Sequence, residues 1–414
     1  MILSRSQEKA RALILNTFME GQRGAILKAA AGTGKTFLVG KLLKELIEAG
    51  FSVCATAPTN KAVGVLKKKI PKQCSAKTTY KLLNLRIAYS EENWLETYIA
   101  QDEDGIIELY HFVVIDECSM IDETVLQYLF DIPNKPFLLF VGDPAQLPPV
   151  QSENNLSPVF ELSDFETVTM TEVIRQKENS PILSLASAIR NSKKRFFPFA
   201  IKGYENGMEL EIINKDDSRE LSGIPILAWR NDRVKNYNQG FHTLNHPNAR
   251  EPFCIGEYII FDKPYRMGLA DIYNGQEGKI VDIGTGFHPY FHHIAVWNIT
   301  LMIEEQDKIF VEKMVYVAMD KRDIEKKLTE LHKKWLACKS KEGKRFILNE
   351  AILWKESFAS ISLSYAITVH KSQGSTFDTV LVDLQDLSAN RSEQYNKLLY
   401  TAITRPSESL LLLA

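Results

Sequence analysis

The sequence lacks paired cysteines, long apolar runs and any excess of one charge. Its cysteines form no CxxC pair, which argues against a disulfide framework or a zinc site and fits a reducing compartment. No apolar run reaches the roughly eighteen residues that a spanning helix needs, and residues 1–7 do not contain the apolar core of a signal peptide. We therefore expect a protein that is neither secreted nor membrane-spanning, with a cytoplasmic location. The cysteines are Cys54, Cys74, Cys118, Cys254 and Cys338.

The overall composition is that of an ordinary globular protein. The chain has 414 residues, which is too long for one core and favours about two to four domains. Apolar residues make up 45% and charged residues 25%, both close to average usage. The formal net charge of −2 gives no global signal for nucleic acid, so any such surface must be local.

A phosphate-binding loop organises the first part of the chain. The apolar run 25–28 predicts a strand, and the helical spacing of apolar residues over 38–47 predicts a helix. Between them lies a glycine-bearing loop whose backbone N–H groups favour an anion. Lys35 is expected to reach the β- and γ-phosphates of ATP, and the Thr36 hydroxyl to ligate Mg²⁺. The nucleotide-binding loop residues are Gly32, Thr33, Gly34, Lys35 and Thr36.

Two carboxylates follow the buried-strand pattern of residues 111–115. Asp116 at a strand end is suited to hold Mg²⁺ through water, and Glu117 to orient or deprotonate the attacking water. Paired acids also occur as solvated turns, but the P-loop upstream favours the catalytic interpretation.

Three further side chains are candidates for contacts with the nucleotide. Gln146 follows the strand pattern 137–141 and is a candidate γ-phosphate sensor. Arg175 follows the last strand of this half and suits a residue that reaches phosphate, although a surface arginine is the alternative. Gln7, upstream of the P-loop, is either a surface glutamine or a reader of adenine, because an amide both donates and accepts.

A second ligand edge follows the strand pattern 52–57. Its polar loop contains Pro58, Thr59 and Asn60, at a position where open α/β sheets bind ligands. Six lysines crowd residues 67–81, and such a run is either a solvated face or a surface that follows phosphates. The hydroxyl of Thr78 and the ring of Tyr80 favour the second interpretation.

The periodicity changes in the middle of the chain. Alternating pieces over 85–110 predict an inserted β-hairpin, and a second α/β pattern begins near residue 181. Four strand patterns between 257 and 317 predict a small antiparallel barrel. Helices are predicted over 320–339 and 346–358 with a polar turn at 340–345, followed by a strand-like run at 360–369. We interpret the loop histidines as surface residues and not metal ligands: His288, His292 and His293.

Three motifs together resemble the superfamily 1 helicases. Residues 142–150 (GDPAQLPPV) and 400–405 (YTAITR) are similar to superfamily 1 forms, and 370–374 (HKSQG) to the 5′→3′ branch of RecD-like and Pif-like enzymes. The resemblance covers essentially the whole chain, and the short length favours a phage member. It implies an α/β fold of two RecA-like P-loop motor domains with ATP between them.

The resemblance also implies domain boundaries. The first motor domain would span 1–176 with a pin hairpin at 86–110, and the second would comprise 177–245 and 360–414. Residues 246–359 would form an SH3-like β-barrel that carries a helical hairpin.

Site residues carry over position by position. The hydrolytic core would consist of Lys35, Thr36, Asp116, Glu117 and Gln146, with Arg175 and Arg405 on the γ-phosphate, Gln7 on adenine and Gly374 in a nucleotide-contacting motif. The residues implied to line single-stranded DNA are Pro58, Thr59, Asn60, Thr78, Tyr80, Pro148, His370 and Ser372. Two positions depart from the family pattern: Ala29 replaces the first P-loop glycine, and Tyr80 stands where relatives often have histidine.

The expected activity is ATP-dependent, 5′→3′ unwinding of DNA with Mg²⁺, by a monomer acting on single strands and on forked or tailed duplex. A nucleotide-switched single-strand clamp and an RNA helicase are the alternatives. Trp94, the largest aromatic residue of the predicted hairpin, is the candidate wedge, since base–aromatic stacking contributes roughly 1–3 kcal/mol. Packing of the hairpin onto the motor domain is the alternative role of Trp94.

Overall fold

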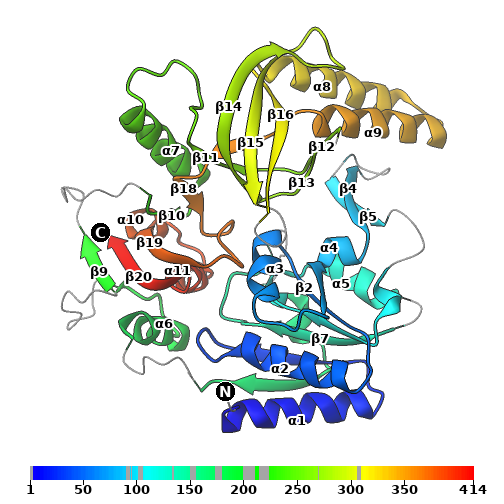
Figure 1. Cartoon of the computed structure of the whole chain (residues 1–414), viewed down its shortest axis with the longest axis vertical. Helices are drawn as coiled ribbons and strands as arrows, with labels where there is room; N and C mark the ends of the chain where they lie inside the picture. The colour runs from blue at the N-terminus through cyan, green and yellow to red at the C-terminus, as the bar shows by residue number, and fades with distance from the viewer. Residues whose placement is uncertain are drawn as a thin grey trace. The chain divides into compact units, whose positions relative to one another are not determined.

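The computed structural model (Figure 1) divides the chain into two compact units. Unit 1 comprises Met1–Asn84, Asp102–Tyr237 and Ala366–Ala414, and unit 2 comprises Leu85–Gln101 and Asn238–Tyr365. The structure describes residues 3–89, 94, 96–100, 106–132, 135–149, 155–172, 180–198, 210–213, 223–268, 270–304 and 309–414.

The first sheet of unit 1 is parallel throughout, with the strand order β3-β2-β6-β7-β1-β8 among the described strands. Its strands are β1 (Gly24–Ala29), β2 (Val53–Ala57), β3 (Ser75–Thr78), β6 (Phe112–Ile115), β7 (Phe137–Gly142) and β8 (Glu166–Met170). The associated helices are α1 (Arg5–Met19), α2 (Lys35–Glu48), α3 (Asn60–Lys67), α4 (Thr79–Leu82) and α5 (Glu123–Phe130), with 3₁₀ turns at Ile106–Leu109, Cys118–Met120 and Pro158–Glu161.

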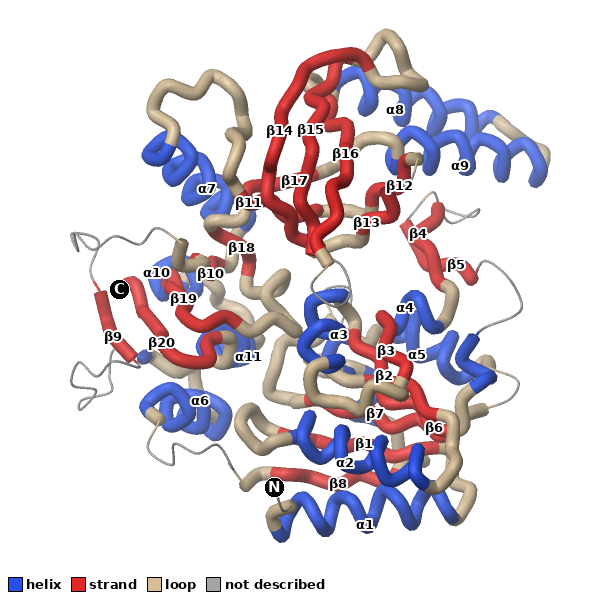
Figure 2. Tube along the Cα trace, viewed as in Figure 1, coloured by secondary structure: helices blue, strands red, loops and turns tan. Residues whose placement is uncertain are grey.

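Local sequence signals explain where these elements begin. Ser4 and Gln7 form a capping box at the start of α1. Strands β2, β6 and β7 are buried along their whole length, as expected for parallel strands that are covered on both faces. Helix α1 packs against β1 and β8, and α2 lies beside α1 (Figure 2). The predicted α/β class with a parallel sheet is confirmed.

A second parallel sheet in unit 1 has the order β18-β10-β19-β20-β9 among the described strands. Its strands are β9 (Leu210–Ile213), β10 (Ile226–Ala228), β18 (Ala366–Thr368), β19 (Phe377–Asp383) and β20 (Pro406–Leu413). The helices of this part are α6 (Pro181–Asn191), α10 (Leu384–Ser388) and α11 (Tyr395–Ile403), and α7 (Asn231–Asn245) runs from unit 1 into unit 2.

Unit 2 is built on an antiparallel sheet with the order β16-β15-β14-β11-β17. Its strands are β11 (Tyr258–Phe261), β14 (Glu277–Phe287), β15 (Ala295–Glu304), β16 (Phe310–Ala318) and β17 (Ile361–Leu363), with the pair β12 (Tyr265–Met267) and β13 (Ala270–Ile272). The unit also holds the hairpin β4 (Leu85–Tyr89) and β5 (Glu96–Ala100) and the helices α8 (Arg322–Ala337) and α9 (Lys341–Glu356).

Several predicted boundaries were wrong. The predicted polar turn 340–345 is mostly the first turn of α9, because the Ser340 hydroxyl accepts from Gly343 N and caps the helix. The strand-like run 360–369 is two strands, β17 and β18, which belong to different sheets. The hairpin pairing ends at Ala100 and not at residue 110.

His288 corrects the interpretation of the loop histidines. Its side chain is fully buried, whereas His292 and His293 are exposed. Nδ1 accepts from the backbone N of Tyr290 and Phe291, and Nε2 contacts the carbonyl of Ser357 at 3.0 Å. A neutral imidazole satisfies all three partners, so His288 is a structural residue of unit 2.

Trp94 lies in an aromatic cluster of unit 2. Its ring stacks on His332 with centroids 5.0 Å apart and lies 5.7 Å from the ring of Trp335. Both partners belong to α8. The connection between β4 and β5 is therefore anchored to the helical hairpin, and the half-buried Trp94 ring is engaged in packing.

Candidate active site

The P-loop connects β1 to α2 in unit 1. Gly32 and Gly34 have φ values of 80° and 74°, in the left-handed region that favours glycine. In the described structure Gly34 is the N-cap of α2 and has no side-chain cap. The first backbone N–H groups of α2 are therefore available to a phosphate group.

Ala29, at the position of the usual first glycine, ends β1 and lies fully buried in the core of the first sheet. It is not among the described non-glycine residues with positive φ. Its methyl group packs in the core, which explains why alanine is accommodated here.

Gln7 lies beneath the P-loop and is 1% exposed. Its Nε2 contacts the carbonyl oxygens of Thr33 and Gly34 at 3.3 and 3.4 Å, and its Oε1 accepts from Ser4 N. The amide thus supports the loop backbone. Its predicted role at the adenine stays a prediction.

Lys35 and Glu117 form an ion pair, with Lys35 Nζ 3.2 Å from Glu117 Oε1. Burial acts to lower the pKa of Lys35, but the carboxylates of Glu117, Asp116 and Asp143 raise it overall. Burial opposes ionisation of Glu117, but Lys35 and Arg405 lower its pKa below the usual range. Both groups are therefore charged at neutral pH.

Asp116 and Glu117 follow β6 directly. Burial, reinforced by the neighbouring Glu117 carboxylate, raises the pKa of Asp116 to about 6. Asp116 Oδ1 accepts from the backbone N of Glu117. Glu117 has a φ of 53°, a strained conformation for a residue with a side chain, and such strain is concentrated at functional sites.

The buried polar atoms that lack a hydrogen-bond partner among the described residues include two acceptors of this site, Glu117 Oε2 and Gln146 Oε1. Leaving a buried acceptor unsatisfied costs about 1–3 kcal/mol, so each is expected to have a partner that is not part of the chain. The attacking water, which donates O–H groups, fits both. Thr36, half-buried in the first turn of α2, and Asp116 offer the oxygen atoms that Mg²⁺ prefers.

A buried network that sequence reasoning missed lies beside the loop. Asp143, fully buried after β7, accepts from the Tyr400 hydroxyl at 2.6 Å and pairs with Arg190. The Tyr400 oxygen also accepts from Ala31 N in the P-loop. This network joins the first sheet to α6 and α11 of the second. Its only signal in the sequence is that Asp143 and Tyr400 lie in two motifs of the helicase resemblance.

Arg405 is 5% exposed and contacts only its own part of unit 1 in the hydrogen bonds described. Its guanidinium donates to the carbonyl oxygens of Thr401 and Ser375 and to the Thr404 hydroxyl. The positive charge of Arg405 also contributes to the lowered pKa of Glu117, after the larger contribution of Lys35. Arg175 lies outside the described residues.

The predicted DNA-lining residues divide by exposure. Pro58, Thr78, Pro148 and Ser372 are buried, whereas Thr59, Asn60, Tyr80 and His370 are half-buried. Three of the hydroxyls have local roles: Thr59 caps α3, Thr78 caps α4 and Ser372 donates to the carbonyl of Val369. These contacts position loop backbone, and direct contact with DNA stays a prediction.

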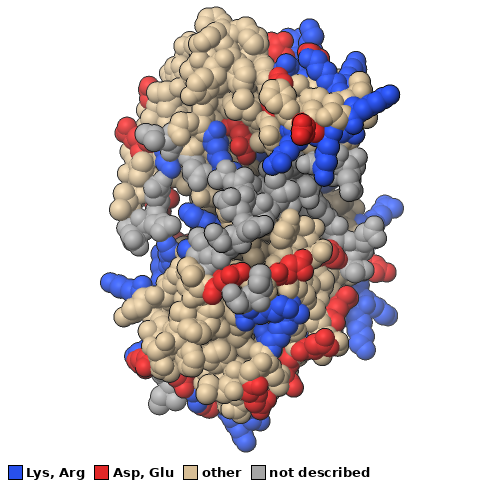
Figure 3. Space-filling view, turned by 90° about the vertical axis from the view of Figure 1, so that its right-hand side faces the viewer, with Lys and Arg blue, Asp and Glu red and all other residues tan. Residues whose placement is uncertain are grey.

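Gly374 has a φ of 71°, and a Cβ there would lie 2.9 Å from Ala62 Cβ and 3.4 Å from Thr59 Oγ1. Glycine thus permits close approach of the motif 370–374 to the start of α3. On the face shown in Figure 3, Lys and Arg side chains are interspersed with Asp and Glu, as expected from a net charge near zero.

Comparisons with known proteins identify the family. A family model described as an AAA domain matches residues 3–214, about half of the chain, and one described as a UvrD-like helicase C-terminal domain matches residues 363–413. The chain belongs to the AAA domain family, as a Pif1-like superfamily 1 helicase. The two matches cover the P-loop half and the segment that contains Gly374, Tyr400 and Arg405.

Individual relatives agree with this assignment. The chain is 25% identical to the ATP-dependent DNA helicase Dda of phage T4 over 97% of both chains. It is 23% identical to the Pif1 helicase of Campylobacter jejuni, over 72% of this chain and 68% of that protein. A solved structure of two Pif1 helicases at forked DNA matches with a TM-score of 0.57 at 17% identity, covering 100% of this chain and 92% of that one. No helix in the described part of the chain is long and apolar enough to cross a bilayer.

Proposed function

We propose that this protein is an ATP-dependent DNA helicase that moves 5′→3′ on single-stranded DNA and unwinds forked or tailed duplex as a monomer. One observation carries the proposal: Lys35 of the P-loop pairs with Glu117, and Glu117 and Gln146 each keep a buried acceptor that no described residue satisfies. The names of the relatives, which include DNA helicases over nearly the whole chain, support DNA as the substrate.

The residues of the site suit the hydrolysis of ATP. Lys35 is expected to exchange its ion pair with Glu117 for the β- and γ-phosphates, since phosphates carry more charge than one carboxylate. Glu117 is then free to accept a proton from the attacking water, which Gln146 orients. Thr36 and Asp116 would hold Mg²⁺, and the metal would supply charge neutralisation on the phosphates.

Contacts within unit 1 offer a route from nucleotide to DNA. Leu147 N donates to Thr401 Oγ1 at 3.1 Å, and Gln373 Nε2 donates to Leu147 O at 3.0 Å. Leu147 lies between Gln146 and Pro148, so movement of the second sheet acts on a segment that carries both residues. We infer that closing and opening of the two sheets moves this segment along the strand.

Two features of unit 2 complete the proposed motor. The β4–β5 hairpin is proposed as the pin that separates strands, and the antiparallel sheet with α8 and α9 as the SH3-like insert. Support comes from the antiparallel pairing of both elements and from the anchoring of Trp94 on α8. Arg175 and Arg405 are proposed to contact the γ-phosphate when the sheets close.

The deciding experiment is displacement of a labelled strand from a duplex that bears either a 5′ or a 3′ single-stranded tail. We expect ATP-dependent displacement only with the 5′ tail. Slow hydrolysis without displacement would instead favour a single-strand clamp, and displacement from RNA but not DNA would favour an RNA helicase. Displacement only from the 3′ tail would contradict the proposed direction.

A further inference from the structure

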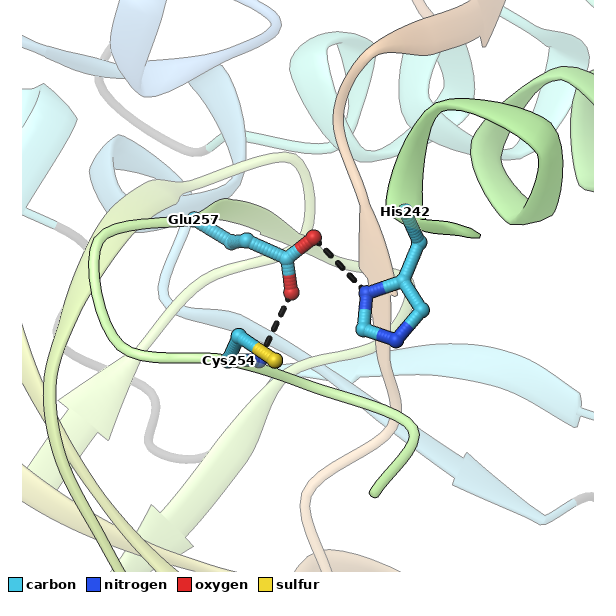
Figure 4. A group of neighbouring side chains, drawn as sticks. All are labelled: His242, Cys254 and Glu257. Carbon is cyan, nitrogen blue, oxygen red and sulfur yellow. Dashed lines mark hydrogen bonds and ion pairs between the residues drawn. The ribbon is translucent and has the colours of Figure 1, made fainter. Parts of the chain in front are cut away.

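Three side chains of different chemistry meet in unit 2, whereas the nucleotide site belongs to unit 1. His242 comes from the last turn of α7, Cys254 from the loop that follows, and Glu257 from the residue before β11. One imidazole nitrogen, the Sγ atom and one carboxylate oxygen lie within 4.8 Å of one another. Figure 4 shows the Glu257 carboxylate between the ring of His242 and Cys254.

Glu257 is held in a fixed orientation. Its side chain is 1% exposed. Oε2 accepts from the backbone N of Cys254 at 2.7 Å, and Oε1 accepts from the Tyr365 hydroxyl at 2.9 Å. A buried carboxylate requires a compensating positive charge in addition to such donors.

The environment of the His242 ring identifies where that charge belongs. Nδ1 lies 2.8 Å from Glu257 Oε1, and Nε2 lies 3.1 Å from the carbonyl oxygen of Glu251. Both neighbours are acceptors, but a neutral imidazole has only one N–H. Nε2–H can donate to Glu251, and a metal ion held between Nδ1 and the Glu257 carboxylate then satisfies both of those groups; a proton held between them is the alternative.

A second histidine lies on the same side of α7. His246 follows His242 by four residues, and its backbone N donates to the His242 carbonyl, so the helical turn continues to this position. Its Nε2 is 3.8 Å from Glu257 Oε1. Two histidines four residues apart on a helix face one way and are a common pair of zinc ligands.

We propose that His242, Cys254 and Glu257 bind one structural Zn²⁺ ion, with the fourth position taken by His246 or water. Zinc accepts nitrogen, sulfur and oxygen ligands in one tetrahedron. The hydrogen bond from His242 to the Glu251 carbonyl is the outer contact that metal-bound histidines usually make. The ion would tie the end of α7 to the first strand of the antiparallel sheet.

The ligand atoms need only small movements to reach tetrahedral geometry. Zn–N and Zn–S bonds of about 2.1 and 2.3 Å place neighbouring ligand atoms roughly 3.4–3.7 Å apart. The His242–Glu257 contact of 2.8 Å would have to open and the longest separation of 4.8 Å to close. Binding releases the Cys254 thiol proton, whose pKa is raised by burial and by Glu257 and Glu251, so affinity is expected to rise with pH.

The cysteine spacing, which we interpreted as evidence against zinc, does not reveal this site. A CxxC search requires two cysteines. Here a single cysteine, Cys254, is combined with a helical histidine pair and with Glu257, three residues after the cysteine. His242 and Glu257 are fifteen residues apart. Only the packing of α7 beside β11 brings them together.

The test uses untagged full-length protein, stripped with a chelator and titrated first with Zn²⁺ and then with Co²⁺. We expect one equivalent of Zn²⁺ per chain and a thiolate-to-cobalt charge-transfer absorption with Co²⁺. Cys254→Ser should abolish that absorption, and His242→Asn should weaken binding at least tenfold. Cys338→Ser is the matched control, since Cys338 is also half-buried in unit 2 but contacts Ser340 instead.

Two outcomes would overturn the proposal. Absence of binding at micromolar Zn²⁺ would mean that a proton and not a metal ion lies between His242 and Glu257, and would overturn the proposal. Equal cobalt spectra for Cys254→Ser and Cys338→Ser would place the metal elsewhere. DNA-stimulated ATP hydrolysis is measured in parallel to test whether each variant is folded. We expect this activity not to depend on the proposed ion.

Discussion

At the residue scale, Lys35 is expected to have different partners in the nucleotide-free and the nucleotide-bound site. In the structure it neutralises Glu117, and the same ammonium group is proposed to bind phosphate when ATP is present. The carboxylate that would act as the base is thus restrained until nucleotide displaces it. Such an arrangement limits water activation when the site contains no ATP.

Replacing Lys35 by alanine should abolish ATP turnover and leave single-strand binding largely intact. The reason is that, among the contacts described, Lys35 contacts the Glu117 carboxylate and no predicted DNA-lining residue. Turnover and fluorescence anisotropy of labelled DNA measure the two effects. Lys44→Ala on the same helix is the control, because Lys44 is 63% exposed and pairs only with Glu48 in the ion pairs described. A normal hydrolysis rate in Lys35→Ala would exclude the assigned site.

Arg405→Ala should lower turnover by about 10³-fold or more with a modest loss of ATP affinity, as expected for an arginine that stabilises the transition state. The described hydrogen bonds of Arg405 to Thr401 and Ser375 suggest a structural role as the competing explanation. Thermal unfolding of the variant separates the two. A turnover loss below about tenfold would mean that Arg405 is structural.

At the scale of elements, the packing of Trp94 on α8 gives its ring a role in anchoring the hairpin, beside the predicted role as a wedge. The ring packs on His332 and Trp335, so its removal should free the β4–β5 connection from α8. We predict that Trp94→Ala keeps DNA-stimulated hydrolysis near normal and loses much of its strand displacement. His332→Ala should give a similar loss, because it breaks the same stack. Loss of displacement in Trp94→Ala alone would favour a direct wedge role for the ring.

His288 predicts how the stability of unit 2 depends on pH. Burial lowers the pKa of His288 below its ordinary value of 6.5, with a smaller contribution from His292 and an opposing hydrogen bond to Ser357. The unfolded chain then binds the proton more readily than the folded one, so stability is complete above pH 6.5 and falls as the pH drops below it.

Chemical denaturation at pH 7.5 and at pH 5.5, followed by tryptophan fluorescence, measures this effect. We expect a lower free energy of unfolding at the acidic pH, with the difference retained in His292→Gln because His292 is exposed. The difference should shrink in His288→Gln. An unchanged pH dependence in that variant would show that another group controls it.

The parallel sheets could be predicted because buried strands appear in the sequence as short apolar runs that end in polar loops, as at Phe112–Ile115 before Asp116. The start of α9 could not, because Ser340 and Gly343 are turn residues that here form a cap. Strands β17 and β18 were merged because only tertiary pairing separates them. The Asp143–Tyr400–Arg190 network joins residues more than 200 positions apart, a distance over which local periodicity carries no information.

At the scale of the whole molecule, the net charge of −2 does not indicate whether the surface contains a local basic groove. Binding to single-stranded DNA should nevertheless weaken steeply with salt. If about four phosphates are contacted, the slope of log K against log salt should be near −3. Affinity measured at several salt concentrations gives that slope. A flat response would leave the proposed phosphate contacts without support.

The strand order of the second sheet determines when its strands can pair during synthesis on the ribosome. Strand β10 ends at Ala228 and pairs only with β18 and β19 among the described strands, and β18 begins at Ala366. At about 5–20 residues per second, the roughly 140 residues between them take about 7–28 s to translate. During that interval β10 has no partner while most of unit 2 is being completed. The nascent chain is therefore expected to rely on chaperones at this stage, and slow codons between β10 and β18 would lengthen its exposure.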